Sequence, residues 1–465
     1  MFRITASYCF AILLFTAFNV HADSILLSNV HIVDVVKGTV QKQQDIYIRD
    51  GNILEISPHD AASGQADAHA DLRVIDYSGK FVIPGLWDMH VHPDTTDDLE
   101  LMVINGVLGA RSLMGEAKHL KWRAEVALGQ RIGPRLFLAG PIVEGHPPEG
   151  MEGLITTKGR RLISTEEEGV QEARAQYQAG FDYIKVYNNL PIPAYRGLIE
   201  EGQRLGIPVL GHVPIEVGLD NALRWGQIGI EHLRGSIQLL VDDNAPEKPG
   251  NDLRSRMLAW QYVNEAHMSD LVELTSRYDV YHCPTVVARL FFSPSPRVQE
   301  YLSRPESLFI QPRWRGILED RAGTKWLSNF SEADFESAAA GFKMMDAYIR
   351  ALHGAGVPIL AGTDMGPWGF SLHDELVGLV QAGLSIPDVL RSATIHAARF
   401  SGVDGKVGEI KTGAIADLVI LDANPLADIR NTREIHAVMQ GGRIMDRNTL
   451  DKRLEILESA QRLQN

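Results

Sequence analysis

The sequence predicts an α/β fold, a (β/α)8 TIM-type barrel combined with a small composite β-sandwich built from both ends of the chain. Strand-like and helix-like runs alternate over residues 86–401, a pattern typical of parallel sheets. Short strands without intervening helices fill residues 23–85, and short strands and turns return over residues 402–446. We therefore expect residues 86–401 to form the barrel and the two flanking segments to pair in one sandwich.

Residues 1–22 have the pattern of a secretory signal peptide. A weakly basic start at Arg3 precedes an almost wholly apolar run over residues 9–20, which ends before the small residue Ala22. The run is too short for a convincing membrane span, although an uncleaved anchor is the alternative. We expect export to the periplasm of a Gram-negative cell, or secretion, without stable membrane insertion after the signal is removed.

Composition narrows the functional classes further. The chain of 465 residues is 45% hydrophobic and 22% charged, which is ordinary for a globular enzyme with a large core. Its net charge of −14 argues against nucleic acid or an anionic membrane surface as a partner. Because Cys9 lies in the predicted signal, the mature chain keeps one thiol, Cys283, and no internal disulfide.

The barrel prediction depends on the number of strand-like runs, which is eight, as in a closed (β/α)8 barrel. These runs are residues 86–91, 107–113, 135–138, 183–187, 209–213, 228–233, 280–287 and 359–363. Helical stretches between them include residues 166–179, 193–205 and 332–355, the last with a cap from Ser331 and Asp334. Longer spacings at 234–279 and 288–330 predict inserts that form a lid or wall over the top face.

The flanking strands are short. On the N-terminal side we expect strands over residues 24–35, 45–49, 53–56, 74–77 and 81–83, with a loop at 61–70. On the C-terminal side we expect them at 408–410, 416–421 and 437–446, followed by a short helix over residues 447–465.

Polar residues interrupt the apolar barrel strands near their carboxyl ends, where active sites of this fold concentrate. His90 and His92 stand at i and i+2, so both imidazoles face one side of an extended strand. The same position in later strands is taken by Lys185, His212, His232 and Asp364. Several imidazoles with a carboxylate and a buried lysine suit two divalent metal ions, and zinc is the expected metal.

This residue set resembles the amidohydrolase superfamily. The resemblance lies in PGLWDMHVH around His90, DYIKVY around Lys185 and the closing GAIADLVILDANPL. Within the superfamily the chain is most similar to the imidazolonepropionase-like, Xaa-Pro dipeptidase-related branch. The resemblance implies that Lys185 is carbamylated by carbon dioxide and bridges the metals. It further implies that His90 and His92 hold one metal with Asp364, and that His212 and His232 hold the other.

The ligand types also predict the chemistry. Two metals lower the pKa of a shared water, so that a metal-bridging hydroxide is available near neutral pH. Asp364 would accept its proton and deliver it to the leaving nitrogen as the catalytic acid–base residue. The expected activity is therefore hydrolysis of a C–N amide bond, and the resemblance suggests small substrates such as dipeptides or N-acyl amino acids.

Two other functions stay open at this point. One is hydrolysis of a cyclic amide or imidazolone ring, or deamination of a heterocycle, and the other is a non-catalytic binding or assembly protein on the same fold. For substrate contacts we consider His146, Tyr281 and His373. Strand alternation lets only one of Tyr281 and His282 face the pocket, and the sequence leaves that choice open, as it does homo-oligomer formation.

Overall fold

The computed structural model describes residues 24–60, 72–146, 159–250 and 252–464. The predicted signal peptide and the predicted 61–70 loop therefore lie outside the described residues. Within these ranges, no helix is both long and apolar enough to cross a membrane.

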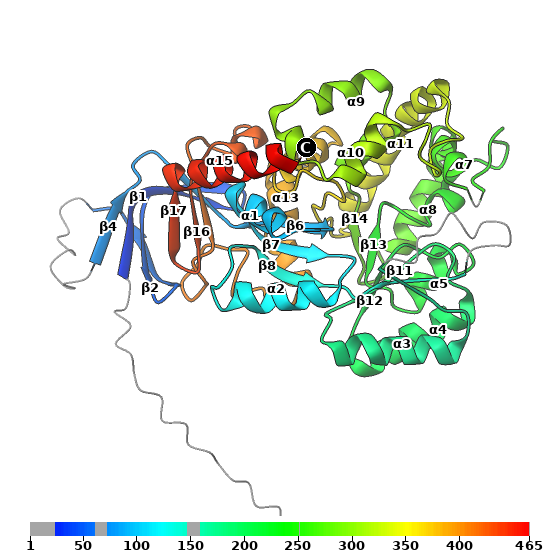
Figure 1. Ribbon diagram of the computed structural model, residues 1–465, viewed down its shortest axis with the longest axis horizontal. Coiled ribbons are helices and arrows are strands. Elements are labelled where there is room, and N and C mark those ends of the chain that lie inside the picture. Colours follow the sequence, from blue (N-terminus) through cyan, green and yellow to red (C-terminus); the bar gives the residue numbers. More distant parts are fainter. Residues whose placement is uncertain (1–23, 61–71, 147–158, 251, 465) are drawn as a thin grey trace, which may run out of the picture.

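Strands from the two ends of the chain pair in one mixed sheet. Its strands are β1 (Ser24–Asp34), β2 (Thr39–Arg49), β3 (Asn52–Pro58), β4 (Leu72–Asp76), β5 (Phe81–Pro84), β15 (Leu418–Leu421), β16 (Ile435–Gln440) and β17 (Arg443–Asp446). Their order is β17-β16-β15-β5-β1-β2-β3, with β4 on β1, and the antiparallel β5–β15 pair joins the two halves. Figure 1 shows this sheet at one end of the molecule, with β16 and β17 beside the N-terminal strands.

The sandwich prediction differs from this arrangement in one respect. The strand pairings among the described residues form a single sheet, and they do not give two separate stacked sheets. A hydrophobic cluster of its own, including Ile46, Val82 and Leu418, is buried within this part of the chain. The segment 408–410, predicted as a strand, is a bend, and Gly408 has a φ of 86° that extended backbone does not adopt.

The barrel strands follow the predicted runs with shorter bounds. They are β6 (Leu86–Val91), β7 (Val107–Ser112), β8 (Arg135–Leu138), β11 (Ile184–Val186), β12 (Val209–Gly211), β13 (Gly229–Glu231) and β14 (Tyr281–Cys283). β9 (Ile142–Glu144) and β10 (Arg160–Leu162) extend the sheet beside β11. All of these strands pair in parallel, as βαβ connections require.

The barrel strands do not form one continuous closed sheet in the described residues. β6–β8 form one sheet and β9–β14 another. Isolated parallel bridges join Ala139 to Tyr183 and His282 to Ile359. The eighth run makes backbone hydrogen bonds to its neighbours, since the Met89 amide donates to the Ala361 carbonyl at 2.9 Å. The strand ends consequently face a common centre, although the ladder is interrupted twice.

Helices surround these strands (Figure 1). They are α1 (Thr96–Ile104), α2 (Ala117–Ala127), α3 (Glu166–Ala179), α4 (Ile192–Leu205), α5 (Gly218–Arg224), α6 (Ile237–Leu240), α7 (Leu253–Leu258), α8 (Glu265–Thr275), α9 (Ser295–Leu302), α10 (Pro312–Glu319), α11 (Glu332–Gly354), α12 (Phe370–Gln381), α13 (Ile386–Ser392), α14 (Ile395–Phe400) and α15 (Arg447–Gln464). Capping boxes begin α3 at Thr165 and α11 at Ser331, because each cap hydroxyl and the acidic residue three positions later satisfy free backbone amides.

The insert over residues 288–330 folds as α9, α10 and 3-10 turns at Val286–Phe292 and Pro305–Phe309. Its Gln311 side chain donates to the His92 carbonyl at 3.2 Å, and the Tyr301 hydroxyl donates to the Gly366 carbonyl at 3.3 Å. The insert therefore lies against the chain that follows the first and eighth barrel runs, as the wall prediction requires.

Candidate metal centre

The six predicted ligands come from five different strand ends. His90 lies in β6 and His92 just after it, Lys185 is central in β11, and His212 and His232 directly follow β12 and β13. Asp364 follows the eighth run, and its amide donates to the His90 carbonyl at 2.7 Å. We call these six residues the ligand cluster.

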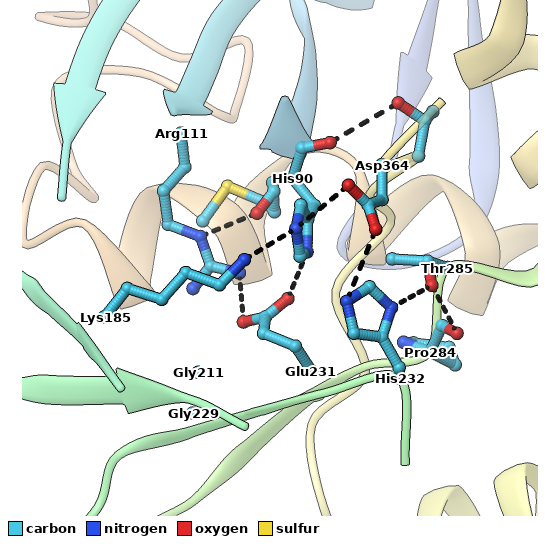
Figure 2. A network of polar contacts seen from close by, with 12 residues as sticks. His90, Arg111, Lys185, Gly211, Gly229, Glu231, His232, Pro284, Thr285 and Asp364 are labelled. Carbon is cyan, nitrogen blue, oxygen red and sulfur yellow. Dashed lines mark hydrogen bonds and ion pairs between the residues drawn. The ribbon is translucent and has the colours of Figure 1, made fainter. Parts of the chain in front are cut away.

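The structure brings the ligand cluster together around Asp364. Its Oδ1 lies 3.0 Å from His92 Nε2 and 3.4 Å from His90 Nε2, and its Oδ2 lies 3.4 Å from His232 Nε2. Lys185 Nζ lies 3.2 Å from His90 Nε2. The His212 ring centroid lies 5.1 Å from that of His232, which connects His212 to the cluster through His232. Figure 2 shows His90, His232, Lys185 and Asp364 pointing toward one another.

The other ring nitrogen of two of these histidines is held by an oxygen acceptor. His90 Nδ1 lies 2.7 Å from Glu231 Oε2, and His212 Nδ1 lies 2.8 Å from Asn188 Oδ1. Because an ionised carboxylate and an amide oxygen only accept hydrogen bonds, each Nδ1 carries the proton. The lone pair of each neutral ring is then on Nε2, the nitrogen that faces the cluster.

His232 is oriented in the same way by a hydroxyl. Thr285 Oγ1 lies 2.6 Å from His232 Nδ1 and donates its own hydrogen to the Pro284 carbonyl at 2.8 Å. The hydroxyl oxygen therefore accepts from His232 Nδ1, which leaves the Nε2 lone pair directed toward Asp364 (Figure 2). His232, Thr285 and Asp364 all adopt positive φ, a rare backbone conformation that occurs often at functional sites.

A buried ion pair between Arg111 and Glu231 holds the side chain that contacts His90. Arg111, fully buried in β7, donates to Glu231 Oε1 at 2.7 Å and to the Met89 carbonyl at 2.6 Å. Both Glu231 oxygens are therefore used, one for Arg111 and one for His90 (Figure 2). From the sequence, Arg111 could bind a substrate carboxylate or form a structural ion pair, and the contacts show the ion pair. Glu231 stands directly before His232 in the sequence, and that adjacency was the available signal.

A second carboxylate positions the backbone of the site. Asp88 accepts from the amides of His90 at 3.1 Å and Thr363 at 3.0 Å, and from the Thr363 hydroxyl at 2.7 Å. Burial raises the pKa of Asp88 to about 7, against the lowering effect of these donors. The side chain connects β6 to the eighth run, and this fixes His90 and Asp364 relative to each other.

Burial also sets the protonation of the ligand cluster. It lowers the pKa of His90, His212 and His232 well below 6.5, so these rings are neutral near pH 7. It lowers the pKa of Lys185 to about 8, which makes a neutral amine accessible near neutral pH. Neutral imidazoles are the form that binds metal ions.

The donor set fits a divalent metal site. Ligand atoms of His90, His232 and Asp364 all lie within 4.8 Å of one another, and the two histidines face Asp364 with Nε2. Imidazole nitrogen and carboxylate oxygen are ligands for zinc and similar ions. A second grouping of His90, Glu231 and Cys283 is also close, but Glu231 is already occupied by Arg111, and burial raises the pKa of the Cys283 thiol well above its usual value.

Two of the three predicted substrate contacts, Tyr281 and His373, make their contacts away from the ligand cluster, and the role of the third, His146, stays a prediction. Tyr281 packs edge-on against Phe400 with ring centroids 5.1 Å apart, and the neighbouring His282 faces Tyr348 of α11 at 6.5 Å. His373 on α12 is buried against Thr432, 2.9 Å away, and the Asn105 carbonyl. His146 is exposed after β9. Tyr281 and His373 satisfy packing and hydrogen bonding elsewhere, so the prediction of a pocket role for them is not supported by their contacts.

Parts of the sequence are similar to known amidohydrolases. Residues 336–445 match the model of the amidohydrolase family. A 68-residue stretch is 46% identical to the dihydroorotase of Carboxydothermus hydrogenoformans, covering 15% of this chain and 14% of that protein. A 116-residue stretch is 30% identical to the ochratoxinase of Aspergillus niger, covering 23% of this chain and 24% of that protein. The chain thus aligns with less than a quarter of the length of these curated relatives.

Solved structures align over almost the whole chain. A bottromycin amidohydrolase is similar with a TM-score of 0.75 and 26% identity, covering 94% of this chain and 91% of that one. A Xaa-Pro dipeptidase with methionine bound in its active site has a TM-score of 0.65 and 20% identity, covering 91% and 100%. The Aspergillus niger ochratoxinase has a TM-score of 0.65 and 16% identity, covering 91% and 96%. The last two similarities concern the fold alone. Residues 336–445 thus match the amidohydrolase family, and nearly the whole chain is similar to a bottromycin amidohydrolase.

Proposed function

We propose that this protein is a metal-dependent amidohydrolase that cleaves the C–N amide bond of a small substrate such as a dipeptide or an N-acyl amino acid. The observation that carries the proposal is the convergence of Nε2 atoms from His90, His92 and His232 on Asp364. For His90 and His232 the opposite nitrogen is anchored, a feature of metal-binding histidines.

The proposed cofactors are two divalent metal ions, with zinc expected. His90 and His92 with Asp364 would hold one ion, and His212 and His232 would hold the other, with Lys185 between them. Ions bound there would lower the pKa of a water and polarise the scissile carbonyl. Asp364 accepts the proton of the attacking water and passes it to the leaving nitrogen, so that the amine departs neutral.

Lys185 is proposed to be the carbamate bridge. Its neutral amine attacks carbon dioxide through the nitrogen lone pair. A C–N bond forms while one C–O π bond breaks and its electron pair moves to oxygen, and the nitrogen releases one proton to water, which leaves an anionic carbamate. The pKa of about 8 and the burial of the side chain support this step, since a charged ammonium would be costly there. The resulting pair of oxygens would add the anionic ligand that a second metal needs.

A second candidate is hydrolysis of a cyclic amide. It is favoured by the local similarity to proteins named dihydroorotase and imidazolonepropionase, the latter 33% identical over 85 residues. The deaminase alternative has no specific support among the contacts of the described residues. A non-catalytic binding protein would be expected to lack some of the six ligands, whereas all six residues are present here.

We also propose that the mature enzyme is exported, on the basis of residues 1–22 alone. Fractionation of cells that express the full chain checks this proposal. We expect the protein in the periplasm or medium with residues 1–22 removed, and recovery of the uncut chain in the cytoplasm would contradict export.

The proposed function is tested by elemental analysis of the purified mature protein beside a library of dipeptides and N-acyl amino acids. About two metal ions per chain with turnover of a library member would support the proposal. About one ion without cleavage would favour the ring hydrolase, and dihydroorotate-like cyclic amides would then be assayed. Absence of bound metal after purification and after zinc addition would overturn both.

A further inference from the structure

The turn that follows β11, residues 187–189, holds the His212 ring in two ways. Asn188 Oδ1 lies 2.8 Å from His212 Nδ1. The Tyr187 ring stacks on the His212 ring, with centroids 4.0 Å apart and an angle of 23° between the ring planes. The edge and the face of this imidazole are therefore both contacted by one short turn, which we call the β11 turn.

A glutamate at the end of β9 holds the β11 turn in place. Glu144 Oε1 accepts from the Asn189 amide at 2.7 Å and from the Gly145 amide at 3.2 Å. The two chain segments approach so closely that a Cβ at Gly145 would overlap the Asn189 carbonyl oxygen. Because the Asn189 backbone is fixed in this way, the position of the neighbouring Asn188 depends on the end of β9.

Arg160 of β10 holds the same glutamate and the same turn. Its Nη1 donates to Glu144 Oε2 at 2.9 Å, and its Cζ lies 4.4 Å from the centroid of the Tyr187 ring. Burial raises the pKa of Glu144 to about 7, and the Asn189 amide and the charge of Arg160 oppose this rise. Arg160 therefore favours the carboxylate form of Glu144, in which both oxygens accept hydrogen bonds.

His212 thus differs from the other anchored histidines in the number of steps that fix it. A carboxylate contacts His90 directly, and a hydroxyl contacts His232 directly. The anchor of His212 is an amide on a turn, so its orientation depends on what holds that turn. Partners that orient a metal-binding histidine contribute to metal affinity, and this dependence extends to Glu144 and Arg160.

We propose that Glu144 and Arg160 are positioning residues for His212. Their effect passes through Asn188 and Tyr187, and it sets the affinity of the metal ion that His212 and His232 would hold. This inference rests on the proposed function, since the readout is metal binding at the proposed site.

The test is zinc titration of the metal-free protein in competition with a chelating dye. We expect Glu144→Ala to weaken one of the two zinc ions by about 10- to 100-fold and to affect the other much less. Glu144→Gln should keep most of the affinity, because its amide oxygen still accepts from the Asn189 amide. Glu201→Ala is the matched control and should keep both ions, since Glu201 is a buried glutamate that pairs with Arg174 at 2.6 Å between α4 and α3.

An Asn188→Leu background separates positioning from a general loss of stability. Asn188→Leu alone should weaken the same ion, and the addition of Glu144→Ala should cost little more, because both residues act on His212 along one path. If Glu144→Ala does not fold, Arg160→Met is used in both backgrounds, with a smaller loss expected in the same direction. Unaltered affinity, equal weakening of both ions or full additivity would overturn the proposal.

Failure of the proposed function gives a different result. If the wild type binds no zinc, the metal-dependent function fails, and the tautomer of His212 in the metal-free protein decides about its positioning. Nitrogen NMR of histidine-labelled protein, with His212 assigned through His212→Gln, should show Nδ1 protonated in wild type and a mixture of tautomers in Glu144→Ala. The same single tautomer in both proteins would overturn the positioning role.

Discussion

Buried histidines occupy two regions of this molecule, the centre of the barrel and the layer between its strands and outer helices. His90 in the centre and His282 in the outer layer are both fully buried, and burial lowers the pKa of both. Their partners differ, since His90 has Glu231 on Nδ1 and faces Asp364 with Nε2. Both ring nitrogens of His282 are without a hydrogen-bond partner among the described residues.

The comparison separates the proposed ligands His90 and His232 from a packed histidine, whereas His92 shares only the Nε2 contact to Asp364, since its Nδ1 has no hydrogen-bond partner among the described residues. Burial and a lowered pKa are common to both regions, so neither identifies a ligand. An anchored Nδ1 together with an Nε2 aimed at other ligands occurs at His90 and His232 and is absent at His282. Substitutions at these residues and at their partners show whether the difference in anchoring has functional consequences.

The largest effect is expected for Lys185→Ala. Without the amine there is no carbamate, so most bound metal should be lost. Turnover should fall by roughly 1,000-fold or more, because metal stabilisation of the transition state is worth several kcal/mol. Metal content and kcat/KM are the measurements, with the exposed Lys121→Ala on α2 as control. A variant that keeps two metals and full turnover would exclude the bridging role.

An intermediate effect is expected for Glu231→Gln, which tests the anchor of His90. The amide cannot accept from both Arg111 and His90 as the carboxylate does, so the His90 tautomer is less well fixed. Metal affinity should fall about 10- to 100-fold, as for other partners of metal-binding histidines. Competition with a chelating dye measures this affinity.

Because Glu231→Gln also leaves Arg111 incompletely paired, a second variant separates metal binding from stability. Thr285→Val removes the acceptor of His232 Nδ1 while keeping a β-branched side chain at this strained backbone position. Thr285→Val should lower the metal affinity, as Glu231→Gln does. Thr285→Ser should keep the wild-type affinity, because serine retains the hydroxyl. Unaltered metal affinity in both Glu231→Gln and Thr285→Val would show that the anchors are irrelevant.

The smallest effect on the metal centre is expected for His282→Phe, which should retain full metal content. Its effect is on the pH dependence of stability. The pKa of His282 is about 4 in the folded state and 6.5 when exposed, so the unfolded chain alone binds this proton between these values. Wild-type stability should therefore fall as pH decreases from 6.5 to 4, by about 1.4 kcal/mol per pH unit from this residue.

Chemical denaturation of both proteins at pH 7, 6, 5 and 4 checks this prediction. The difference in unfolding free energy between wild type and His282→Phe cancels the contributions of the other histidines. As the pH decreases from 6.5 to 4, the unfolding free energy of wild type should fall relative to that of His282→Phe. A constant difference would show that His282 is protonated in the folded protein, or exposed to water.

Local sequence patterns determined the elements and the ligand positions. The predicted helix over 166–179 coincides with α3, since Thr165 and Glu168 form its capping box and Gly180 ends it with a left-handed φ. The polar residues that became the ligand cluster were visible because each interrupts an apolar strand at its carboxyl end. These signals depend on residues a few positions apart, so the chain itself contains them.

The tertiary structure alone decided the contacts between distant residues. Arg111 and Glu231 are 120 positions apart, and nothing near either residue in the sequence identifies the other as its partner. The same holds for the pairing of β5 with β15 and for the outward position of His282. The physical reason is that pairing and burial are set by the three-dimensional neighbours of a side chain, which sequence periodicity does not specify.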